Sequence, residues 1–381
     1  MERAARDLRF CSYSGDRRTK LQTQIMEVRS AHHNERDEVL DLLSRWYGDR
    51  AFFERYNRLD PRFRDELCLV ARDGGQLVST VQIFDRAINL DRQAVPTGGI
   101  GSVFTLEEYR HKGVASALMR LAVDTMVREG FEVSLLFAER LTFYNMFGWR
   151  EVERKFSILA AASSLDVADH FVIDSFEIER DLGEIAAMHR KYSGRFNVTA
   201  VRDDSAWRAN LKFAGNQPLH PGEGSEEYFV VCRDGSRIAA YARVTRFHGV
   251  SMVMEYGYLP GGVEVDAMLA TFKYLGQSAS GLPVTVRTTG DHRRASLLHS
   301  SSKPAEPSVL VTHTAHDPRL EKALGDAGCP VAHHVDNNYM WRVLAPDKLA
   351  RRFAMAPAAA SAHAFEIFAD SRSVFWTADR F

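Results

Sequence analysis

The sequence is poor in cysteine, and its cysteines lie far apart. They are Cys11, Cys68, Cys232 and Cys329 in a chain of 381 residues, and no two of them form a C-x-x-C pair. Disulfide frameworks and structural zinc sites depend on paired or closely spaced cysteines. The spacing therefore predicts reduced thiols, no metal site and a cytoplasmic protein.

The sequence also lacks an excess of one charge and a long apolar run. Lysine and arginine number 49 and aspartate and glutamate 50, which gives a formal net charge of −1. Nucleic-acid-binding proteins usually carry a strong positive excess, and a membrane helix needs roughly 18 apolar residues in a row. We therefore expect neither a nucleic-acid nor a membrane partner, whereas a homo-oligomer is compatible with the sequence.

What is present is an ordinary globular composition, with 45% hydrophobic and 26% charged residues. The length predicts two or three domains, each large enough to bury its own core. Residues 1–25 differ because they are polar and rich in arginine, and Glu2, Asp7 and Asp16 argue against an acid-poor transit peptide. We expect a disordered tail here, or an over-long start whose true first residue is Met26.

The hydrophobic spacing after residue 26 predicts helices first and then strands. Residues 35–46, and a second stretch that ends before Pro61, carry apolar side chains at helical spacing. Strands are predicted at 67–71, 77–84, 98–105, 133–138 and 150–158, and helices at 113–128 and 142–146. A helix that crosses between strands of a mixed sheet is typical of an α/β fold.

The last part of the chain shows shorter patterns. We predict a loop at 300–307, a strand at 338–344, a helix at 346–353, a loose Ala-rich stretch at 354–364 and short strands at 365–368 and 374–376. The loose assignment depends on Pro357, because proline is unfavourable inside a helix.

A short motif recurs in the middle of the chain. VARDG at residues 70–74 reappears as VCRDG at 231–235, and the second copy also continues into a strand and a helix. We therefore expect two similarly folded halves. The segment LPGGV at 259–263 stands where the first half has a glycine-and-base loop, so the second half is expected to be structural.

That glycine-and-base loop joins the strand at 98–105 to the helix at 113–128. It contains Arg110, Lys112 and Gly113. A helix N-terminus presents unpaired N–H groups and partial positive charge, and nearby cations strengthen its attraction for phosphate. The loop is neither a Walker loop nor a dinucleotide fingerprint. From spacing alone, a pyrophosphate cradle and an ordinary turn with solvated cations are equal alternatives.

Two motifs about thirty residues apart carry a family resemblance. Arg110-x-x-Gly113-x-Ala115 resembles the R-x-x-G-x-G/A motif of GNAT acetyltransferases, in its place between a strand and a long helix. Residues 143–149 (FYNMFGW) resemble the F-Y-x-x-x-G-[FYW] segment that closes the catalytic half of that fold. The resemblance implies that acetyl-CoA is the cosubstrate.

The layout further resembles the enhanced intracellular survival (Eis) family, with GGIGSV at 98–103 and YMWRVL at 339–344 fitting it. This implies tandem GNAT folds, each a mixed twisted sheet with flanking helices, and a sterol-carrier-like C-terminal segment. About 45 residues remain after Asp336, so that segment is reduced here. The implied domains are the tail (1–25), a catalytic GNAT domain (26–160), a degenerate GNAT-like domain (161–335) and a short C-terminal segment (336–381).

The resemblance implies an N-acetyltransferase in which a primary amine of a small molecule attacks the thioester directly. Tyr144 aligns with the general acid of GNAT enzymes, and a phenol with a pKa near 10 is protonated at neutral pH. The other interpretation of Tyr144 is a packed aromatic residue. Cofactor contacts are expected from Val103, Phe104 and Thr105 to the pantetheine arm, and from Arg110, His111, Lys112, Gly113, Val114 and Ala115 to the pyrophosphate.

In Eis-type enzymes the chain's own C-terminal carboxylate enters the active site, which implies that Phe381 supplies the general base. Phe375 and Trp376 nearby favour a docked tail over a frayed one. Arg380 stands where the best-known members carry an acidic residue, which argues against aminoglycosides as substrates.

Two other functions remain alternatives. One is a non-catalytic acyl-CoA-binding or scaffolding protein, against which the intact turn and Tyr144 argue. The other is a lipid-binding protein, against which the shortness of the C-terminal segment argues.

Overall fold

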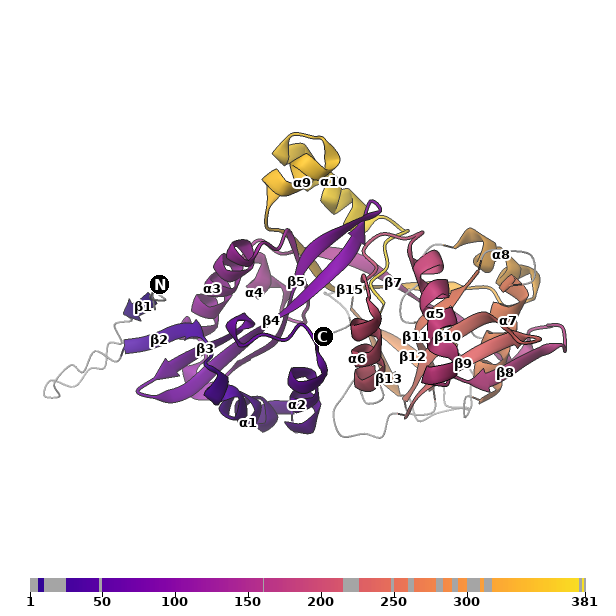
Figure 1. Cartoon of the computed structure of the whole chain (residues 1–381), viewed down its shortest axis with the longest axis horizontal. Helices are drawn as coiled ribbons and strands as arrows, with labels where there is room; N and C mark the ends of the chain where they lie inside the picture. Colours follow the sequence, from indigo (N-terminus) through magenta and orange to yellow (C-terminus); the bar gives the residue numbers. More distant parts are fainter. Residues whose placement is uncertain are drawn as a thin grey trace, which may run out of the picture.

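The described part of the chain forms a 13-stranded sheet, a separate two-stranded sheet and the helices that pack around them (Figure 1). The computed structural model describes residues 6–9, 25–47, 50–159, 161–214, 226–247, 250–259, 264–278, 284–289, 294–299, 309–311, 317–376 and 379.

The first half of the chain ends at residue 159. Its elements are β1 (Arg6–Arg9), β2 (Ile25–Ser30), η1 (His33–Glu35), α1 (Arg36–Tyr47), α2 (Arg50–Leu59), β3 (Cys68–Asp73), β4 (Gln76–Leu90), β5 (Gln93–Thr105), η3 (Glu107–Tyr109), α3 (Val114–Glu129), β6 (Val133–Phe137), α4 (Leu141–Asn145) and β7 (Arg150–Leu159). Helix α3 crosses between β5 and β6, which pair in parallel.

The second half follows the same order from its first strand to its last, with one extra hairpin. Its elements are β8 (Phe171–Ser175), α5 (Ile178–Ser193), α6 (Asp204–Ala214), β9 (Glu226–Asp234), β10 (Arg237–Phe247), β11 (Val250–Tyr258), α7 (Glu264–Ser278), β12 (Val284–Thr289), β13 (Arg294–His299), β14 (Val309–Val311), α8 (Pro318–Asp326) and β15 (Ala332–Val343). Helices α9 (Pro346–Phe353) and α10 (Pro357–Ala369) come after it.

The two halves also share a local irregularity in their first hairpin. The β3–β4 ladder passes over Val78, and the β9–β10 ladder passes over Ala239 at the equivalent place. An unpaired residue of this kind is a β-bulge, which increases the local twist of the strand. The repeated motif of the sequence therefore marks two hairpins of the same geometry.

The last strand of each half lies inside the other half's part of the sheet. The strand order is β1-β2-β3-β4-β5-β6-β15-β7-β14-β11-β10-β9-β8. Strand β15 pairs antiparallel with both β6 and β7, and β7 pairs in turn with β14. The start assigned to the C-terminal segment, residue 336, thus falls within a central strand.

The helices and hairpins nearest the motifs are confirmed. Helix α3 begins one residue after Gly113, α9 has the predicted bounds, and the strands on either side of residues 74–75 pair as a hairpin. Strand β2 was not predicted, and β1 lies within the segment for which a disordered tail was predicted. The predicted loop at 300–307 lies outside the described residues.

The prediction for residues 354–368 is wrong, because most of that stretch forms α10. Pro357 stands at the first position of this helix, where no intrahelical N–H bond is lost. The alanines that follow are strong helix formers. Residues 374–376 form no strand, although Ser373 makes a single bridge to Asn197.

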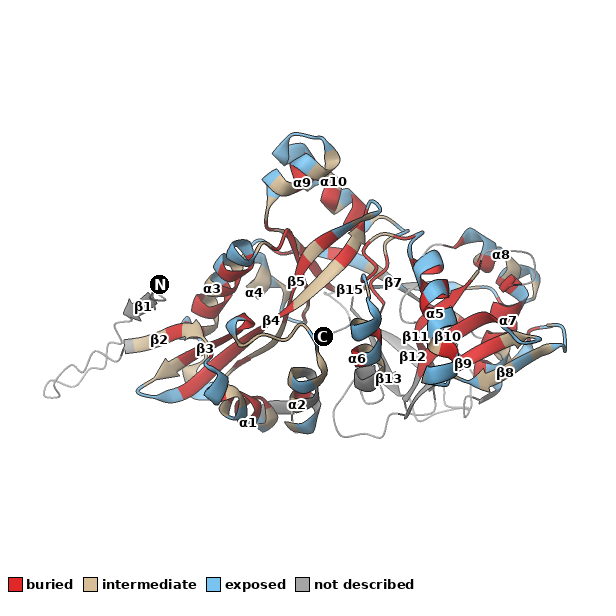
Figure 2. Cartoon of the chain, viewed as in Figure 1, coloured by how far each residue is buried: buried red, intermediate tan, exposed pale blue. Residues whose placement is uncertain are grey.

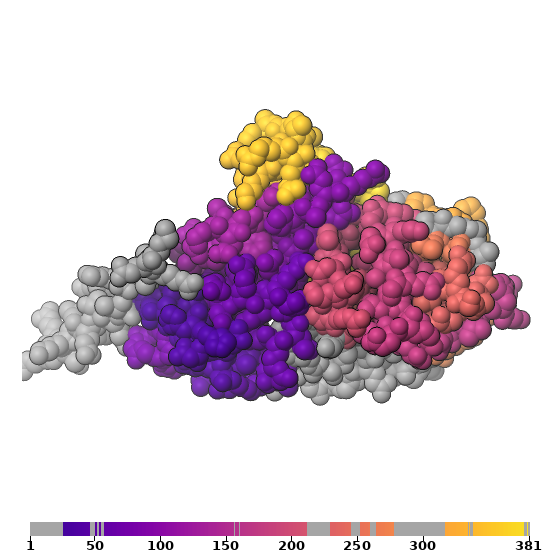
Figure 3. Space-filling view, in the orientation of Figure 1, coloured from indigo at the N-terminus to yellow at the C-terminus, as the bar shows by residue number. Residues whose placement is uncertain are grey.

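Buried residues lie in both halves and at the junction between them (Figure 2). A third cluster joins β4, β6 and β15 to α9 and α10. In it, Trp341 of β15 is 2% exposed and stacks on Phe368 of α10, with ring centroids 4.4 Å apart. This contact ties the base of the α9–α10 pair to the sheet, while its far end stands out from the surface (Figure 3).

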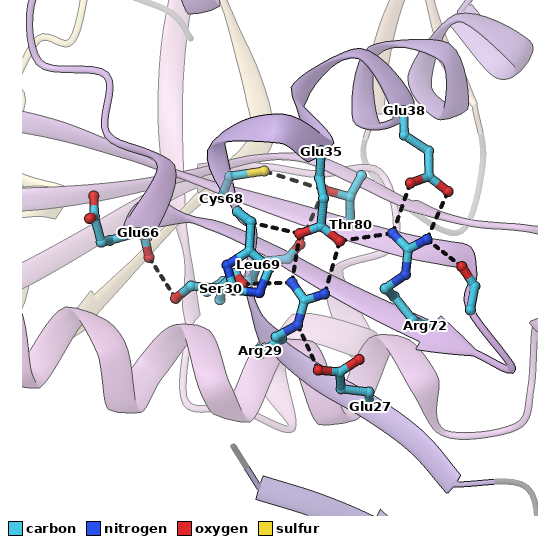
Figure 4. Close-up of polar contacts among 12 residues, drawn as sticks. Glu27, Arg29, Ser30, Glu35, Glu38, Glu66, Cys68, Leu69, Arg72 and Thr80 are labelled. Atoms are coloured by element: carbon cyan, nitrogen blue, oxygen red, sulfur yellow. Dashed lines mark hydrogen bonds and ion pairs between the residues drawn. The ribbon is translucent and has the colours of Figure 1, made fainter. Parts of the chain in front are cut away.

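Glu35 joins the first strands and helices of the first half (Figure 4). Arg29 of β2 donates to both Glu35 carboxylate oxygens, at 2.6 and 2.9 Å, and Arg72 of β3 donates at 2.9 Å. The backbone N–H of His32 adds a further bond at 2.7 Å. These bonds from Arg29 lower the pKa of Glu35 to about 2, although burial opposes the shift.

We predict that Glu35→Gln destabilises the protein by about 3 kcal/mol at pH 7, since each pKa unit corresponds to about 1.4 kcal/mol. Because the pKa of Glu35 is lower in the folded protein than its value near 4.5 in the unfolded chain, the ionised carboxylate stabilises the fold above that pH. This stabilisation is lost as the pH falls toward about 2. The measurement is urea unfolding at pH 7 and at lower pH, where the difference between variant and parent should shrink. Glu27→Gln, at a carboxylate 41% exposed, is the control. An equal loss at every pH would contradict the assignment.

Candidate cofactor and active site

The β5–α3 connection is a tight turn that presents N–H groups at the start of a helix. Residues 110–113 form the turn, and Gly113 is the N-cap of α3 with φ 79° and ψ 0°. Glycine adopts this left-handed conformation without the strain that a side chain adds. Because the first N–H groups of a helix have no partner within it, the turn offers them to an anion.

Basic side chains border this turn. Arg110 Nε donates to the carbonyl oxygen of Thr105 at 3.3 Å, which holds its guanidinium at the end of β5. Lys112 Nζ lies 5.2 Å from the ring centroid of Tyr109. The predicted phosphate contacts His111, Lys112 and Gly113 are exposed, Arg110 and Ala115 are half-buried, and Val114 is buried. The turn is thus a positively charged surface feature.

Strands β5 and β6 separate beside the turn. Their parallel ladder ends at the pair Ile100–Leu136, although β5 continues to Thr105. The β4–β5 ladder passes over Ser102 and Val103, and Ser102 has a φ of 50°. Such a bulge leaves backbone groups outside the ladder. A ligand along this end of β5 therefore meets backbone N–H and C=O groups that the sheet does not use.

Tyr144 stands on α4, which follows the end of β6. Because β5 and β6 are parallel, their C-terminal ends lie at the same edge of the sheet, and the turn and α4 come together there. Tyr144 is half-buried and meets the Phe143 ring edge-on, with centroids 5.0 Å apart. Val103, Tyr109 and Tyr144 all pack against the core cluster of the first half.

Arg342 of β15 holds the loop after Tyr144, and the sequence analysis did not identify it. It donates to the carbonyl oxygen of Phe147, and its guanidinium lies 5.1 Å from the ring centroid of Trp149. Gly148 between them has a φ of 88°. Arg342 and Phe147 are 195 positions apart in the sequence, so no local sequence pattern could reveal their contact. The pairing of β15 with β6 and β7 brings them together.

The C-terminal tail docks beside the end of β6. Phe375 is 3% exposed and Trp376 is fully buried. The ring centroid of Phe375 lies 5.9 Å from that of Phe137, the last residue of β6. The docked tail agrees with the expectation from its aromatic residues. The predicted base, Phe381, lies outside the described residues.

The cysteines of the described ranges are buried thiols. Burial raises the pKa of Cys68 and of Cys232 to about 12, and it also raises the pKa of Cys329. These thiols are protonated at neutral pH and do not supply a thiolate nucleophile. Over the same ranges, no three His, Cys, Asp or Glu side chains are grouped to hold a metal ion.

None of the helices in the described part of the chain combines the length and the hydropathy that a bilayer crossing requires.

Comparisons with known proteins concern the first half and the fold as a whole. The family model for the acetyltransferase (GNAT) domain matches residues 27–152. No curated protein matches the sequence.

Several solved structures are similar over most of the chain. A GCN5-related N-acetyltransferase from Kribbella flavida is 19% identical with a TM-score of 0.60, covering 87% of this chain and 74% of that one. A probable N-acyltransferase from Enterococcus faecalis V583 is 17% identical with a TM-score of 0.62, covering 84% and 72%. Eis1 from Mycobacterium abscessus is 14% identical with a TM-score of 0.52, covering 87% and 76%.

At these identities the likeness to solved structures concerns the fold, whereas the family model also matches the sequence of the turn and of α4. Both motifs of the site lie within residues 27–152. This chain therefore contains a GNAT acetyltransferase domain.

Proposed function

We propose that the protein transfers an acetyl group from acetyl-CoA to a primary amine of a small molecule, by direct attack in a ternary complex. The observation that carries the proposal is the 110–113 turn, where cations and helix N–H groups lie beside the opening between β5 and β6. The GNAT domain supports an acyl-CoA cosubstrate. Direct transfer needs no cysteine nucleophile, in agreement with the buried, protonated thiols.

The residues of the turn fit the pyrophosphate of CoA. Gly113 places no side chain between a phosphate and the helix N-terminus, and Arg110 and Lys112 add positive charge. Backbone groups of Val103, Phe104 and Thr105 would hold the pantetheine arm along the end of β5. When bound, acetyl-CoA supplies the thioester and the thiolate leaving group.

The second half is in this proposal a degenerate GNAT fold that binds no cofactor. Its helix α7 is the counterpart of α3 but begins with Glu264, followed by Asp266. Glu264 is 8% exposed and pairs with Arg237 at 3.2 Å. Carboxylates occupy the positive end of this helix and repel a phosphate. Most of the LPGGV segment, residues 260–263, lies outside the described residues.

Two groups of the chain would move protons. The carboxylate of Phe381 takes a proton from the acceptor amine, which must be neutral to attack. Backbone N–H groups near Val103 stabilise the negative charge that develops on the acyl oxygen. Tyr144 gives its phenol proton to the departing thiolate. Arg342 keeps the loop after Tyr144 in place.

The proposal is tested by CoA release from acetyl-CoA with polyamines, aminoglycosides, peptides and amino sugars as acceptors. Amine-dependent release with formation of the acetylated amine supports it. Binding of acetyl-CoA without release in the presence of any of these amines would favour the non-catalytic acyl-CoA-binding or scaffolding alternative.

Gly113→Asp should weaken acetyl-CoA binding at least tenfold, because it places a negative charge at the cradle. Calorimetry measures the affinity. Gly183→Asp is the matched control, since it adds the same charge at an open site on α5. Unchanged affinity in a folded Gly113→Asp protein would show that the pyrophosphate lies elsewhere.

Tyr144→Phe should lower kcat by roughly 10²–10⁴-fold, as for other acid–base groups, and leave acetyl-CoA affinity unchanged. Steady-state kinetics at saturating acetyl-CoA give kcat. Tyr274→Phe, at a tyrosine 41% exposed on α7, is the control. If the Phe variant turns over normally, Tyr144 is a packing residue only.

A C-terminal extension should also lower kcat by roughly 10²–10⁴-fold, because it converts the terminal carboxylate into an amide that cannot accept a proton. Deleting Phe381 should act similarly, since it moves the carboxylate back by about 3.5 Å. An N-terminally tagged protein is the reference at saturating acetyl-CoA. Full turnover of the extended protein would assign the base to another group.

A further inference from the structure

The two faces of the sheet differ where β5 approaches the opening. A Cβ atom at Gly98 would collide with Met126 Sδ of α3, so Gly98 faces that helix. Side chains alternate between the two faces along a strand. Gly99 and Gly101 therefore belong to the other face of the sheet, which is turned away from α3 and is called here the far face.

Strand β4 places larger side chains beside these two glycines. Phe84 pairs with Gly99 and Gln82 pairs with Gly101 in the β4–β5 ladder. Residues directly opposite each other in a ladder have their side chains on the same face. Phe84 and Gln82 therefore lie on the far face, along one side of the glycines.

Strand β6 places an aromatic ring on the opposite side of the same glycines. Leu135 pairs with Gly99 in the parallel ladder, and Phe137 follows two residues later, so both belong to the far face. The ring of Phe137 meets that of Tyr339 edge-on, with centroids 4.4 Å apart. On the far face, two residues without side chains thus lie between Phe84 and Phe137.

The far face becomes accessible to solvent at this place. Gly99 is buried, whereas Gly101, Val103 and Phe137 are half-buried. The β5–β6 ladder ends one residue before Gly101. The turn at 110–113 leads into α3, so a cofactor held there comes from the side of that helix. The far face is left for the amine.

The far face holds a carboxylate, but that carboxylate is neutralised. The side chain of Asp60, directly after α2, is 7% exposed and pairs with Arg86 of β4 at 2.8 Å. Arg86 follows Phe84 by two residues and lies 5.6 Å from the centroid of its ring. Asp60 therefore offers little attraction to an acceptor with several positive charges, whereas the neighbouring rings offer apolar contact.

Gln82 supplies a neutral polar group beside Gly101. It is 6% exposed, and its amide nitrogen donates to the Ile83 carbonyl oxygen at 2.9 Å. Within the described ranges, no group is hydrogen-bonded to its amide oxygen Oε1. An amide oxygen accepts a hydrogen bond and takes no proton. It can therefore hold a neutral amine while leaving the nitrogen lone pair available for attack.

We propose that the acceptor is a primary amine on one apolar group, aromatic or branched, which lies over Gly101 between Phe84 and Phe137. Gln82 Oε1 accepts a hydrogen bond from its amino group. This inference rests on the proposed acetyl transfer. The amine nitrogen forms a bond to the acyl carbon, and the carbon–sulfur bond breaks. The general base takes the proton that the amine loses, and the thiolate gains one from Tyr144.

Matched acceptors test the apolar site. The kcat/KM for phenethylamine should exceed that for ethanolamine and for spermidine at least tenfold, since apolar contacts discriminate by about 10- to 200-fold. Phe137→Ala should remove most of this preference, and Phe137→Leu should keep much of it. Phe365→Ala is the control, because Phe365 of α10 is also half-buried and packs on the same core cluster.

Gln82→Met tests the polar contact, because methionine is of similar size and its sulfur is only a weak acceptor. The variant should lower kcat/KM for phenethylamine about tenfold, as for one lost hydrogen bond, and leave acetyl-CoA affinity unchanged by calorimetry. Gln93→Met is the control. Gln93 is half-buried at the start of β5, where its amide donates to the Arg352 carbonyl oxygen at 3.3 Å.

The possible results are distinct. A preference for phenethylamine that is lost in Phe137→Ala and kept in Phe365→Ala supports the inference. Equal or faster turnover of spermidine overturns it and leaves acetyl transfer in place, as does a Phe137→Ala protein that keeps the preference. Unchanged kinetics in Gln82→Met overturn the polar contact. If no amine releases CoA, acetyl transfer itself is overturned, and the inference with it.

Discussion

The antiparallel pairing of β7 with β15 is the interaction on which the rest of the structure depends. Each is the last strand of its half, and each lies next to the other half's penultimate strand. Without this exchange, β6 and β14 would expose rows of unpaired backbone groups at new sheet edges, which folded proteins avoid. Neither half therefore completes its sheet alone, and we infer that the two fold as one unit. The exchange also joins the strands of the two similar halves into one 13-stranded sheet.

The candidate site depends on this strand exchange in two ways. Strand β15 covers one edge of β6, while on the other edge β5 diverges and leaves the opening beside the turn. The same strand carries Arg342 to the loop after Tyr144. After β15, helices α9 and α10 lead the chain back to the junction, where Ser373 bridges to Asn197. The last residues of the chain therefore begin at the junction between the two halves.

Local features could be predicted from the sequence, and features made by distant strands could not. The α3 turn and α4 depend on residues close in sequence, so their motifs were visible. Strand β2 was missed because it is short and carries the charged residues Glu27 and Arg29, and Arg29 finds its partner Glu35 in the following element η1. Helix α10 was misjudged because Pro357 was taken as a breaker although it stands at the first helical position. Arg342, Arg202 and Asp379 gave no signal, since their contacts cross the exchanged strands or the junction.

The two halves differ in what they place at equivalent positions. Gln82 stands nine residues after Asp73 in β4, and Arg243 stands nine residues after Asp234 in β10. Gln82 is uncharged and donates to the Ile83 carbonyl oxygen of its own strand at 2.9 Å. Arg243 instead lies 3.7 Å from Glu255, which also pairs with Arg202, and Arg202 pairs in turn with Asp379 of the tail. The tail therefore contacts both halves, since Phe375 packs near Phe137 of β6 and Asp379 pairs with Arg202 of the second half.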